Sequence, residues 1–281
     1  MRNVLLMLLL VTSLLQVSAQ ICKEEDRTIL EKKFSWLRTA KTGSLPIGDA
    51  IAAIGKSFIG TRYEAFTLET GDDTQPLIML TGLDCTTFLE TSVALALTTK
   101  KGEINFDEYA ANLEKIRYRS GSADGYLSRL HYFTDWIADN SARGIITDVT
   151  RDMGGIPYQM HVSFMSSNPD KYARMTSSAL VDSMKKIEAR INKRSYSYIP
   201  KDKVAGIEES IRNGDLIAIT SSIKGLDIVH VGIAVVGKNN DRVYFMHAPQ
   251  PETDVQITKL PLSDYLKNNK KQTGIMVLRV N

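Results

Sequence analysis

The sequence is poor in the residues from which most catalytic centres are built. Its 281 residues include two cysteines and four histidines, and no histidine is spaced from another histidine or a cysteine as metal ligands usually are. A glycine-rich phosphate loop is missing too. The formal net charge is +3 without a run of basic residues, so nucleic acid is not an expected partner. We therefore expect no metal, no cofactor and no nucleic-acid binding.

Apolar runs of membrane-spanning length are also missing. The run from Val4 to Leu15 falls short of the roughly 20 residues that cross a bilayer. It follows Arg2 and precedes Val17-Ser18-Ala19, which is the order of a secretory signal peptide and its cleavage site. A buried N-terminal helix is the alternative. Ile21 stands before Cys22, where a lipoprotein signal needs a small residue. We therefore expect export, to a periplasm, after cleavage near Ala19.

Removal of residues 1–19 leaves 262 residues, which we expect to form a single catalytic domain over residues 20–281. We expect the thiols of Cys22 and Cys85 to be free, because a core of this size needs no disulfide. Pairing of the two is the alternative in an exported protein. A free cysteine in an oxidising compartment is itself a sign of chemistry.

The periodicity of apolar residues changes along the chain. Apolar stripes predict helices over residues 24–38, 47–58, 85–97, 124–140 and 177–192. Short β-rich segments predict strands over residues 215–220, 230–236, 243–247 and 274–280, with Asn239-Asn240-Asp241 as a hairpin turn. Residues 61–68 are expected to be extended. This order predicts an α+β fold, in which N-terminal helices pack on a small antiparallel sheet and a long, largely helical insertion covers about residues 100–213.

Three residues in these elements have the chemistry of a thiol hydrolase. Cys85 opens a helix, whose free N–H groups and dipole favour a thiolate and can stabilise an oxyanion. His230 begins a strand, which is a rigid mount for a base that takes the thiol proton. His247 ends the next strand and can orient His230 through the other ring nitrogen. Asp84 is placed to cap the helix.

Each residue also has an ordinary explanation. A lone buried cysteine is usually inert, and a half-buried histidine is usually satisfied by a neighbour. The three together favour catalysis. Arg129 and His131 could face the same cleft and bind a polar ligand, although a solvent-facing or satisfied histidine is the default for His131.

The same residues resemble the motifs of the NlpC-type papain-like cell-wall hydrolases. Five segments match in order: Gly60-Thr61-Arg62-Tyr63, Asp84-Cys85-Thr86-Thr87-Phe88, Gly214-Asp215-Leu216-Ile217, His230-Val231-Gly232-Ile233 and His247-Ala248. The resemblance implies a papain-like fold and peptidoglycan as the substrate. It implies Cys85 as nucleophile, His230 as base, His247 as the orienting residue and Tyr63 as a hydroxyl donor near the oxyanion.

The sequence departs from the common pattern of that family in two ways. Thr86-Thr87 replaces Ser-Gly after the cysteine, and His230 follows Cys85 by 145 residues. Together with Ser128-Arg129-Leu130-His131-Tyr132-Phe133, these features resemble one branch, N-acetylmuramoyl-L-alanine amidases long catalogued as a domain of unknown function. Members of that branch cut between the lactyl group of N-acetylmuramic acid and L-alanine. The resemblance therefore implies an exported cysteine amidase that acts on muropeptides, with Thr86 among its substrate contacts.

Several alternatives stay open at this point. Asp84 either caps the helix or binds a sugar or amide group; in stem-peptide cutters the equivalent residue helps to hold a free amine. The activity could instead be an endopeptidase that cuts the stem peptide after D-Glu, peptidoglycan binding without catalysis, or acyl transfer. The insertion at 100–213 is placed to wall off the cleft, so we expect soluble muropeptides to be preferred over intact sacculi.

The expected cleavage site is directly measurable. Because the small-residue site ends at Ala19, the exported protein should begin at Gln20. Intact-mass spectrometry of protein collected outside the cytoplasm checks this. A mass that includes Met1 would contradict the prediction.

Overall fold

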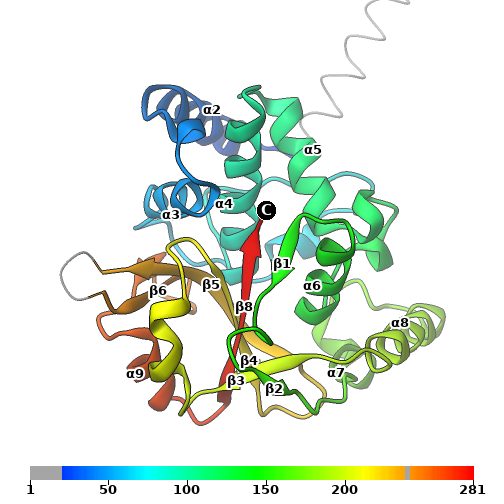
Figure 1. Cartoon of the computed structure of the whole chain (residues 1–281). Coiled ribbons are helices and arrows are strands. Elements are labelled where there is room, and N and C mark those ends of the chain that lie inside the picture. Colours follow the sequence, from blue (N-terminus) through cyan, green and yellow to red (C-terminus); the bar gives the residue numbers. More distant parts are fainter. Residues whose placement is uncertain (1–20, 238–240) are drawn as a thin grey trace, which may run out of the picture.

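An eight-stranded antiparallel sheet runs through the described part of the chain, residues 21–237 and 241–281 of this computed structural model. The strands are β1 (Ile146–Asp148), β2 (Ile156–Pro157), β3 (Ser197–Pro200), β4 (Leu216–Ser221), β5 (Ile228–Val236), β6 (Val243–His247), β7 (Gln256–Ile257) and β8 (Gln272–Val280). Their order is β2-β3-β8-β4-β5-β6-β7, and β1 also pairs with β8. Figure 1 shows β8 passing through the middle of the molecule.

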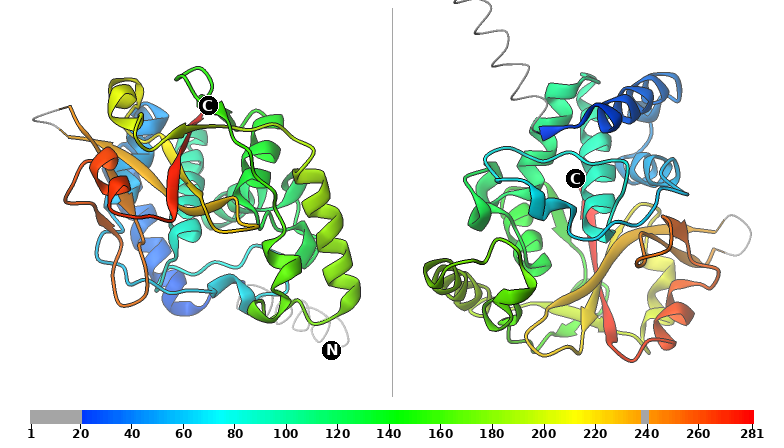
Figure 2. Two further views of the ribbon diagram at one scale, coloured as in Figure 1. Left: turned by 90° about the horizontal axis from the view of Figure 1, so that it is seen from below. Right: turned by 180° about the vertical axis from the view of Figure 1, so that it is seen from behind.

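Helices cover both faces of this sheet. The α-helices are α2 (Glu24–Thr39), α3 (Ile47–Lys56), α4 (Cys85–Lys101), α5 (Phe106–Arg117), α6 (Phe133–Ala142), α7 (Phe164–Ser167), α8 (Ser178–Ile191) and α9 (Leu262–Lys267). Short 3₁₀ helices include η2 (Thr67–Thr70), η3 (Arg119–Gly121), η4 (Tyr126–Ser128) and η6 (Val204–Ser210). Helices α3 and α4 pack on one face in the larger core, whereas α9 and η6 pack on the other in a smaller core (Figure 2).

The alternation along β4 explains why the sheet has two cores. Leu216 and Ala218 belong to the larger core, and Ile217 and Ile219 belong to the smaller one. Because successive side chains of a strand point to opposite faces, both faces of β4 are buried. The strand therefore reads as a continuous apolar run instead of an alternating one.

Most of the expected elements are confirmed. The helices predicted over 24–38, 47–58, 85–97 and 177–192 correspond to α2, α3, α4 and α8, and the four strands correspond to β4, β5, β6 and β8. Antiparallel pairing of β5 with β6 confirms the hairpin, although Asn239 and Asn240 of its expected turn lie outside the described residues, as does the signal peptide expected over 1–19. Both cysteines are free thiols, as expected.

The expected helix over 124–140 is wrong in its first half. Gly125 adopts a positive φ of 75°, and η4 follows. Arg129 is extended and forms a β-bridge with Tyr118, so the regular helix α6 begins only at Phe133. The apolar spacing that suggested a longer helix comes from residues that pack from a turn and an extended segment.

One other expectation needs correction. Residues 61–68 are extended only around Arg62 and Tyr63, which form isolated bridges, and η2 starts at Thr67. The insertion at 100–213 contains α5, α6, α7 and α8, in line with the expected helical character, and it also supplies strands to the sheet. Strands β1 and β3 both pair with β8, on the edge that β4 leaves free. Hydrogen-bonding groups along that edge need partners, and short strands without a strong apolar pattern provide them.

The turn before β4 holds helix α3 against the sheet. Gly214 has a φ of +82°, and a Cβ there would lie 1.9 Å from the carbonyl oxygen of Gly48 in α3. Its N–H donates to Ala234 in β5. The next residue, Asp215, forms an ion pair of 2.7 Å with Arg279 of β8. This Gly-Asp pair therefore fixes three elements relative to one another.

Gly214→Ala should lower the free energy of unfolding by at least about 2 kcal/mol, because it adds both a left-handed strain and a backbone clash. Urea denaturation measures the change. Gly206→Ala is the matched control, since nothing lies within 4 Å of a Cβ at that position. Equal stability of the two variants would show that the turn does not constrain α3.

Candidate active site

Cys85 is the first residue of α4, and its position is fixed by a capping box. Asp84 Oδ1 accepts hydrogen bonds from the backbone N–H of Thr87 at 2.8 Å and from its hydroxyl at 2.9 Å. The Thr87 hydroxyl in turn accepts from the N–H of Asp84. The expected cap is therefore confirmed. Thr87 holds Asp84 in place, which accounts for one of the two threonines that replace Ser-Gly.

His230 and His247 form a hydrogen-bonded pair on adjacent strands. Nε2 of His230 lies 2.7 Å from Nδ1 of His247. If His230 Nδ1 is to serve as a base, Nε2 must carry the hydrogen and His247 must accept it. Gly232 permits the close approach of the two strands, since a Cβ there would lie 2.4 Å from the carbonyl oxygen of Met246.

The thiol of Cys85 lies next to β5, because α4 packs on this strand and the backbone N–H of Val231 is close enough to favour the thiolate. Val231 directly follows His230, so α4 and β5 bring the two expected catalytic residues together. The thiol and the His230 ring make no hydrogen bond to each other. Burial, and then the Asp84 carboxylate, raise the pKa of Cys85 to about 12. Burial and His247 lower the pKa of His230 to about 3.

The resting pair is therefore a neutral thiol and a neutral imidazole. This differs from the thiolate that the helix start and the base His230 led us to expect. The reason is that removal of both groups from water penalises their charged forms more than the helix start and the Val231 N–H favour the thiolate.

Tyr63 is clamped between the chain segments that lead to Cys85 and away from His247. Its N–H donates to the carbonyl of Thr253 at 2.7 Å, and Leu83 forms a bridge to it from the other side. Burial, with Cys85 and Asp84 nearby, raises the pKa of Tyr63 to about 12. Its hydroxyl is therefore protonated and able to donate.

A cavity of about 220 Å³ opens beside the start of α4. The five residues that the sequence suggested as substrate contacts all line it: Tyr63, Asp84, Thr86, Arg129 and His131. Other lining residues were not expected from the sequence, among them Phe66, Glu69, Glu90, Arg117 and Tyr172. Glu90 carried the one usable signal, since it is an acid that directly follows the apolar residues Phe88 and Leu89 in α4, and it is itself buried.

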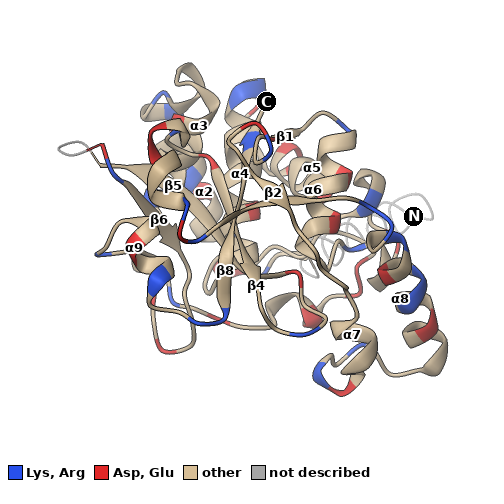
Figure 3. Cartoon of the chain, turned by 60° about the horizontal axis from the view of Figure 1, so that its bottom comes forward, with Lys and Arg blue, Asp and Glu red and all other residues tan. Residues whose placement is uncertain are grey.

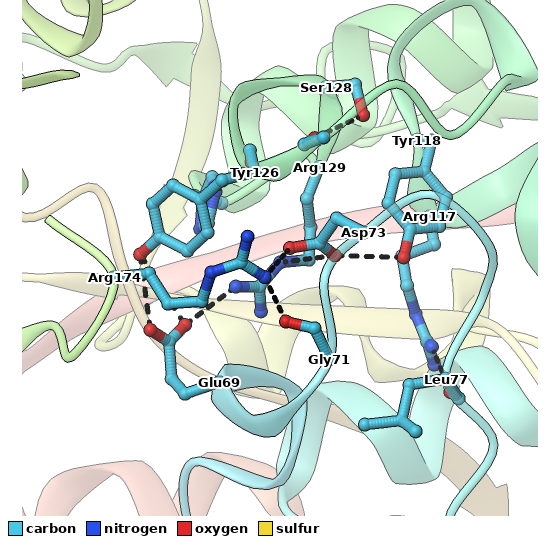
Figure 4. A network of polar contacts seen from close by, with 12 residues as sticks. Glu69, Gly71, Asp73, Leu77, Arg117, Tyr118, Tyr126, Ser128, Arg129 and Arg174 are labelled. Carbon is cyan, nitrogen blue, oxygen red and sulfur yellow. Dashed lines mark hydrogen bonds and ion pairs between the residues drawn. The ribbon is translucent and has the colours of Figure 1, made fainter. Parts of the chain in front are cut away.

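Paired charges build the wall of this cavity. Arg117 Nε lies 2.7 Å from Glu90, and both side chains are almost fully buried. Arg129 lies 2.6 Å from Glu69 and 3.3 Å from Asp73. Figure 4 shows Arg129 and Arg174 reaching the carboxylates of Glu69 and Asp73. Buried charges are stable only when paired in this way.

The loop that carries Glu69 is held by the insertion. Arg174 donates to the carbonyl of Gly71 and lies 3.4 Å from Asp73. Phe66, just before η2, has a φ of 59° and is 64% exposed at the cavity. A non-glycine residue in this conformation is strained, and such strain often accompanies binding sites.

The described residues contain neither a metal-binding cluster nor a membrane-spanning helix. Over residues 21–237 and 241–281, no group of three or more His, Cys, Asp or Glu side chains is arranged to hold a metal ion. Within the same ranges, none of the helices is both long enough and apolar enough to cross a membrane.

Comparisons with known proteins place the chain in a family. An N-acetylmuramoyl-L-alanine amidase from Bacteroides uniformis is 39% identical, with a TM-score of 0.78 over 84% of this chain and 99% of the other. A Bacteroides fragilis protein provisionally described as a xylanase is 38% identical, with a TM-score of 0.75 over 81% of this chain and 100% of its own. A Legionella pneumophila protein is 22% identical and shares the fold, with a TM-score of 0.69 over 94% and 96%. Comparison with curated proteins gave no match.

The mixed α and β fold and these neighbours define an amidase-like protein. Residues 53–275 match the AmiA-like family, described as N-acetylmuramoyl-L-alanine amidase-like, and the chain belongs to that family. Membership supports a peptidoglycan amidase. The wider assignment to the NlpC-type papain-like hydrolases stays a prediction.

The histidine pair makes stability depend on pH. Burial lowers the pKa of His247 to about 4 and contributes most to lowering that of His230 to about 3. The unfolded chain takes up these protons near pH 6.5 and the native protein does not, so stability falls as pH drops below 6.5. Each such histidine costs about 1.5 kcal/mol between pH 6.5 and pH 5. His247→Asn should remove about that much of the pH dependence in urea unfolding, whereas variant His161→Asn, at an exposed site, should match the wild type.

Proposed function

We propose that this protein is an exported cysteine amidase that hydrolyses the amide between the lactyl group of N-acetylmuramic acid and L-alanine in peptidoglycan fragments. The proposal includes the papain-like fold, the signal peptide and a periplasmic site of action. The observation that carries it is the packing of α4 on β5, because this packing brings the Cys85 thiol beside Val231 and hence beside the His230–His247 pair. The family of the chain supplies the substrate class.

In the proposed reaction, proton transfer accompanies the attack, because thiol and imidazole both start neutral. His230 takes the thiol proton at Nδ1 while its Nε2–H donates to His247, and Sγ of Cys85 bonds to the lactyl carbonyl carbon. The first-turn N–H groups of α4 and the Tyr63 hydroxyl stabilise the oxyanion. His230 then gives the proton to the alanine nitrogen as the C–N bond breaks.

This step leaves a thioester on Cys85 and releases the stem peptide with a free L-Ala amine. Water, deprotonated by His230, attacks the thioester carbonyl. The C–S bond breaks, the muramyl acid leaves, and the proton on His230 returns to the thiolate. No metal or cofactor is needed at any stage of this scheme.

The charges around the cavity favour a sugar as the occupant. Its lining carries three carboxylates, on Asp84, Glu69 and Glu90, against the guanidinium groups of Arg117 and Arg129. An ionised carboxylate is therefore disfavoured, and an uncharged, hydroxyl-rich group is suitable. In the amidase reaction that group is the sugar next to the attacked carbonyl. An endopeptidase that cuts after D-Glu would instead bring the stem carboxylate close to the nucleophile.

The insertion supports a preference for soluble fragments. It contributes Arg129, Leu130, His131 and Tyr172 to the cavity, and Arg174 holds the opposite loop in place. A cavity closed on two sides by separate segments suits a chain end better than the middle of a polymer.

Cys85→Ala should abolish release of stem peptide from purified muropeptides, because no other residue can form the thioester. Mass spectrometry of the products measures this, with Cys22→Ala as the matched control, since Cys22 is buried outside the cavity. Cys22→Ala should keep at least about half of the wild-type rate, and intact sacculi should react more slowly than soluble fragments.

Each other result identifies a different activity. An L-Ala-D-Glu product, or its muramyl form, would move the cut into the stem peptide and establish the endopeptidase. Unchanged turnover in Cys85→Ala would end the thioester mechanism. Absence of any product with the wild type, despite measurable binding, would leave a binding protein or an acyltransferase that needs an amine acceptor.

A further inference from the structure

One ring nitrogen of His131 is a hydrogen-bond acceptor whose position is fixed by contacts of the ring with Tyr126. Its Nε2 lies 2.7 Å from the carbonyl oxygen of Tyr126. A carbonyl only accepts, so the hydrogen is on Nε2 and the neutral ring has its lone pair at Nδ1. The ring also packs on the Tyr126 ring, with centroids 4.4 Å apart. Two contacts to one residue therefore fix both the tautomer and the orientation.

The Nδ1 atom is unpartnered and open. It makes no hydrogen bond to any described residue, and it is not among the buried polar atoms that lack a partner, so it keeps some accessible surface. His131 lines the cavity beside Cys85. Burial and the Arg129 guanidinium hold the pKa of His131 well below its ordinary value, so the ring keeps this lone pair at neutral pH.

Other groups in the cavity wall match this acceptor. Asp84 uses Oδ1 for the helix cap and leaves Oδ2 without a hydrogen bond to the described residues. Glu69 and Glu90, by contrast, are occupied by Arg129 and Arg117. The open fixed acceptors, His131 Nδ1 and Asp84 Oδ2, both need donors from the ligand. Hydroxyl and amide N–H groups supply donors, whereas an ionised carboxylate supplies none.

We propose that Nδ1 of His131 accepts a hydrogen bond from a hydroxyl or acetamido N–H of the sugar next to the scissile amide, which makes His131 a specificity-determining residue for the muramyl group. The inference rests on the proposed amidase function, and it assigns His131 to the sugar and not to the stem peptide. The affinity for a substrate that lacks the sugar should therefore not depend on Nδ1 of His131.

Binding to the Cys85→Ala protein tests this without turnover. Calorimetry with N-acetylmuramoyl-L-Ala-D-Glu and with the sugar-free lactoyl-L-Ala-D-Glu gives two dissociation constants for each variant. His131→Phe keeps a ring on Tyr126 but removes the acceptor. It should raise the dissociation constant of the muramyl ligand by about 10- to 100-fold. The dissociation constant of the lactoyl ligand should change by no more than about twofold, because this ligand makes no hydrogen bond to the acceptor.

Two further variants separate the acceptor from the Tyr126 contact. His131→Gln can still donate to the Tyr126 carbonyl but lacks an acceptor at the Nδ1 position, so it should behave like His131→Phe. His131→Asn can place an oxygen there and should recover part of the affinity. His161→Phe, at an exposed position outside the cavity, is the matched control and should bind both ligands like the parent.

The outcomes separate this inference from the proposed function. Equal weakening of both ligands by His131→Phe would overturn the inference, because His131 would then act on the peptide or on the fold. The inference would also be overturned if the Cys85→Ala parent bound the muramyl ligand no more tightly than the lactoyl ligand. Sugar-selective binding that depends on His131, in a wild-type protein that hydrolyses neither ligand, would uphold the inference while the amidase function fails.

Discussion

The burial of helix α4 on nearly every side is the constraint on which the rest of the structure depends. Every residue from Thr87 to Ala96 is buried, so helices, sheet and loops must all cover it. A helix buried in this way needs partners for the N–H groups at its start: Asp84 accepts from the N–H of Thr87, and the Thr87 hydroxyl accepts from the N–H of Asp84. The same cap fixes Cys85, so stability of the fold and placement of the nucleophile depend on one interaction. Glu90 of the same helix is a buried carboxylate that needs a partner, and Arg117 of α5 pairs with it.

The charged clusters show how a buried site obtains polarity without losing stability. Ion pairs between buried side chains gain little net stability, but removal of one partner is costly. Here such pairs join segments that are far apart in sequence: Glu69 and Asp73 precede α4, whereas Arg129 and Arg174 lie in the insertion. Figure 3 shows that charges of both signs are also interspersed along the surface helices. The buried pairs differ from these surface charges in their position beside the cavity. They also join the insertion to the site.

Much of this arrangement could be predicted from the sequence, for identifiable reasons. The stripe of Leu30, Phe34 and Leu37 predicted α2, and all three side chains are buried. The run Val243–His247 predicted a strand with the observed bounds. Helix prediction failed over 124–132, where Gly125 turns the chain and Arg129 pairs with Tyr118. Strands β1 to β3 were missed because they are only two to four residues long. They depend on pairing with distant segments, β1 and β3 with β8 and β2 with β3.

The sequence by itself determined the types of chemistry and the elements that carry them. A cysteine at a helix start and two histidines on adjacent strands are local patterns, and local patterns are visible in a sequence. Only the tertiary structure decided the ionisation of these groups, because burial depends on everything that packs around them. It kept the thiol and imidazole neutral, where the helix start alone favours a thiolate. It also decided that Arg117, Glu69 and Glu90 belong to the cavity, since contacts between distant charged residues leave no periodic signal along the chain.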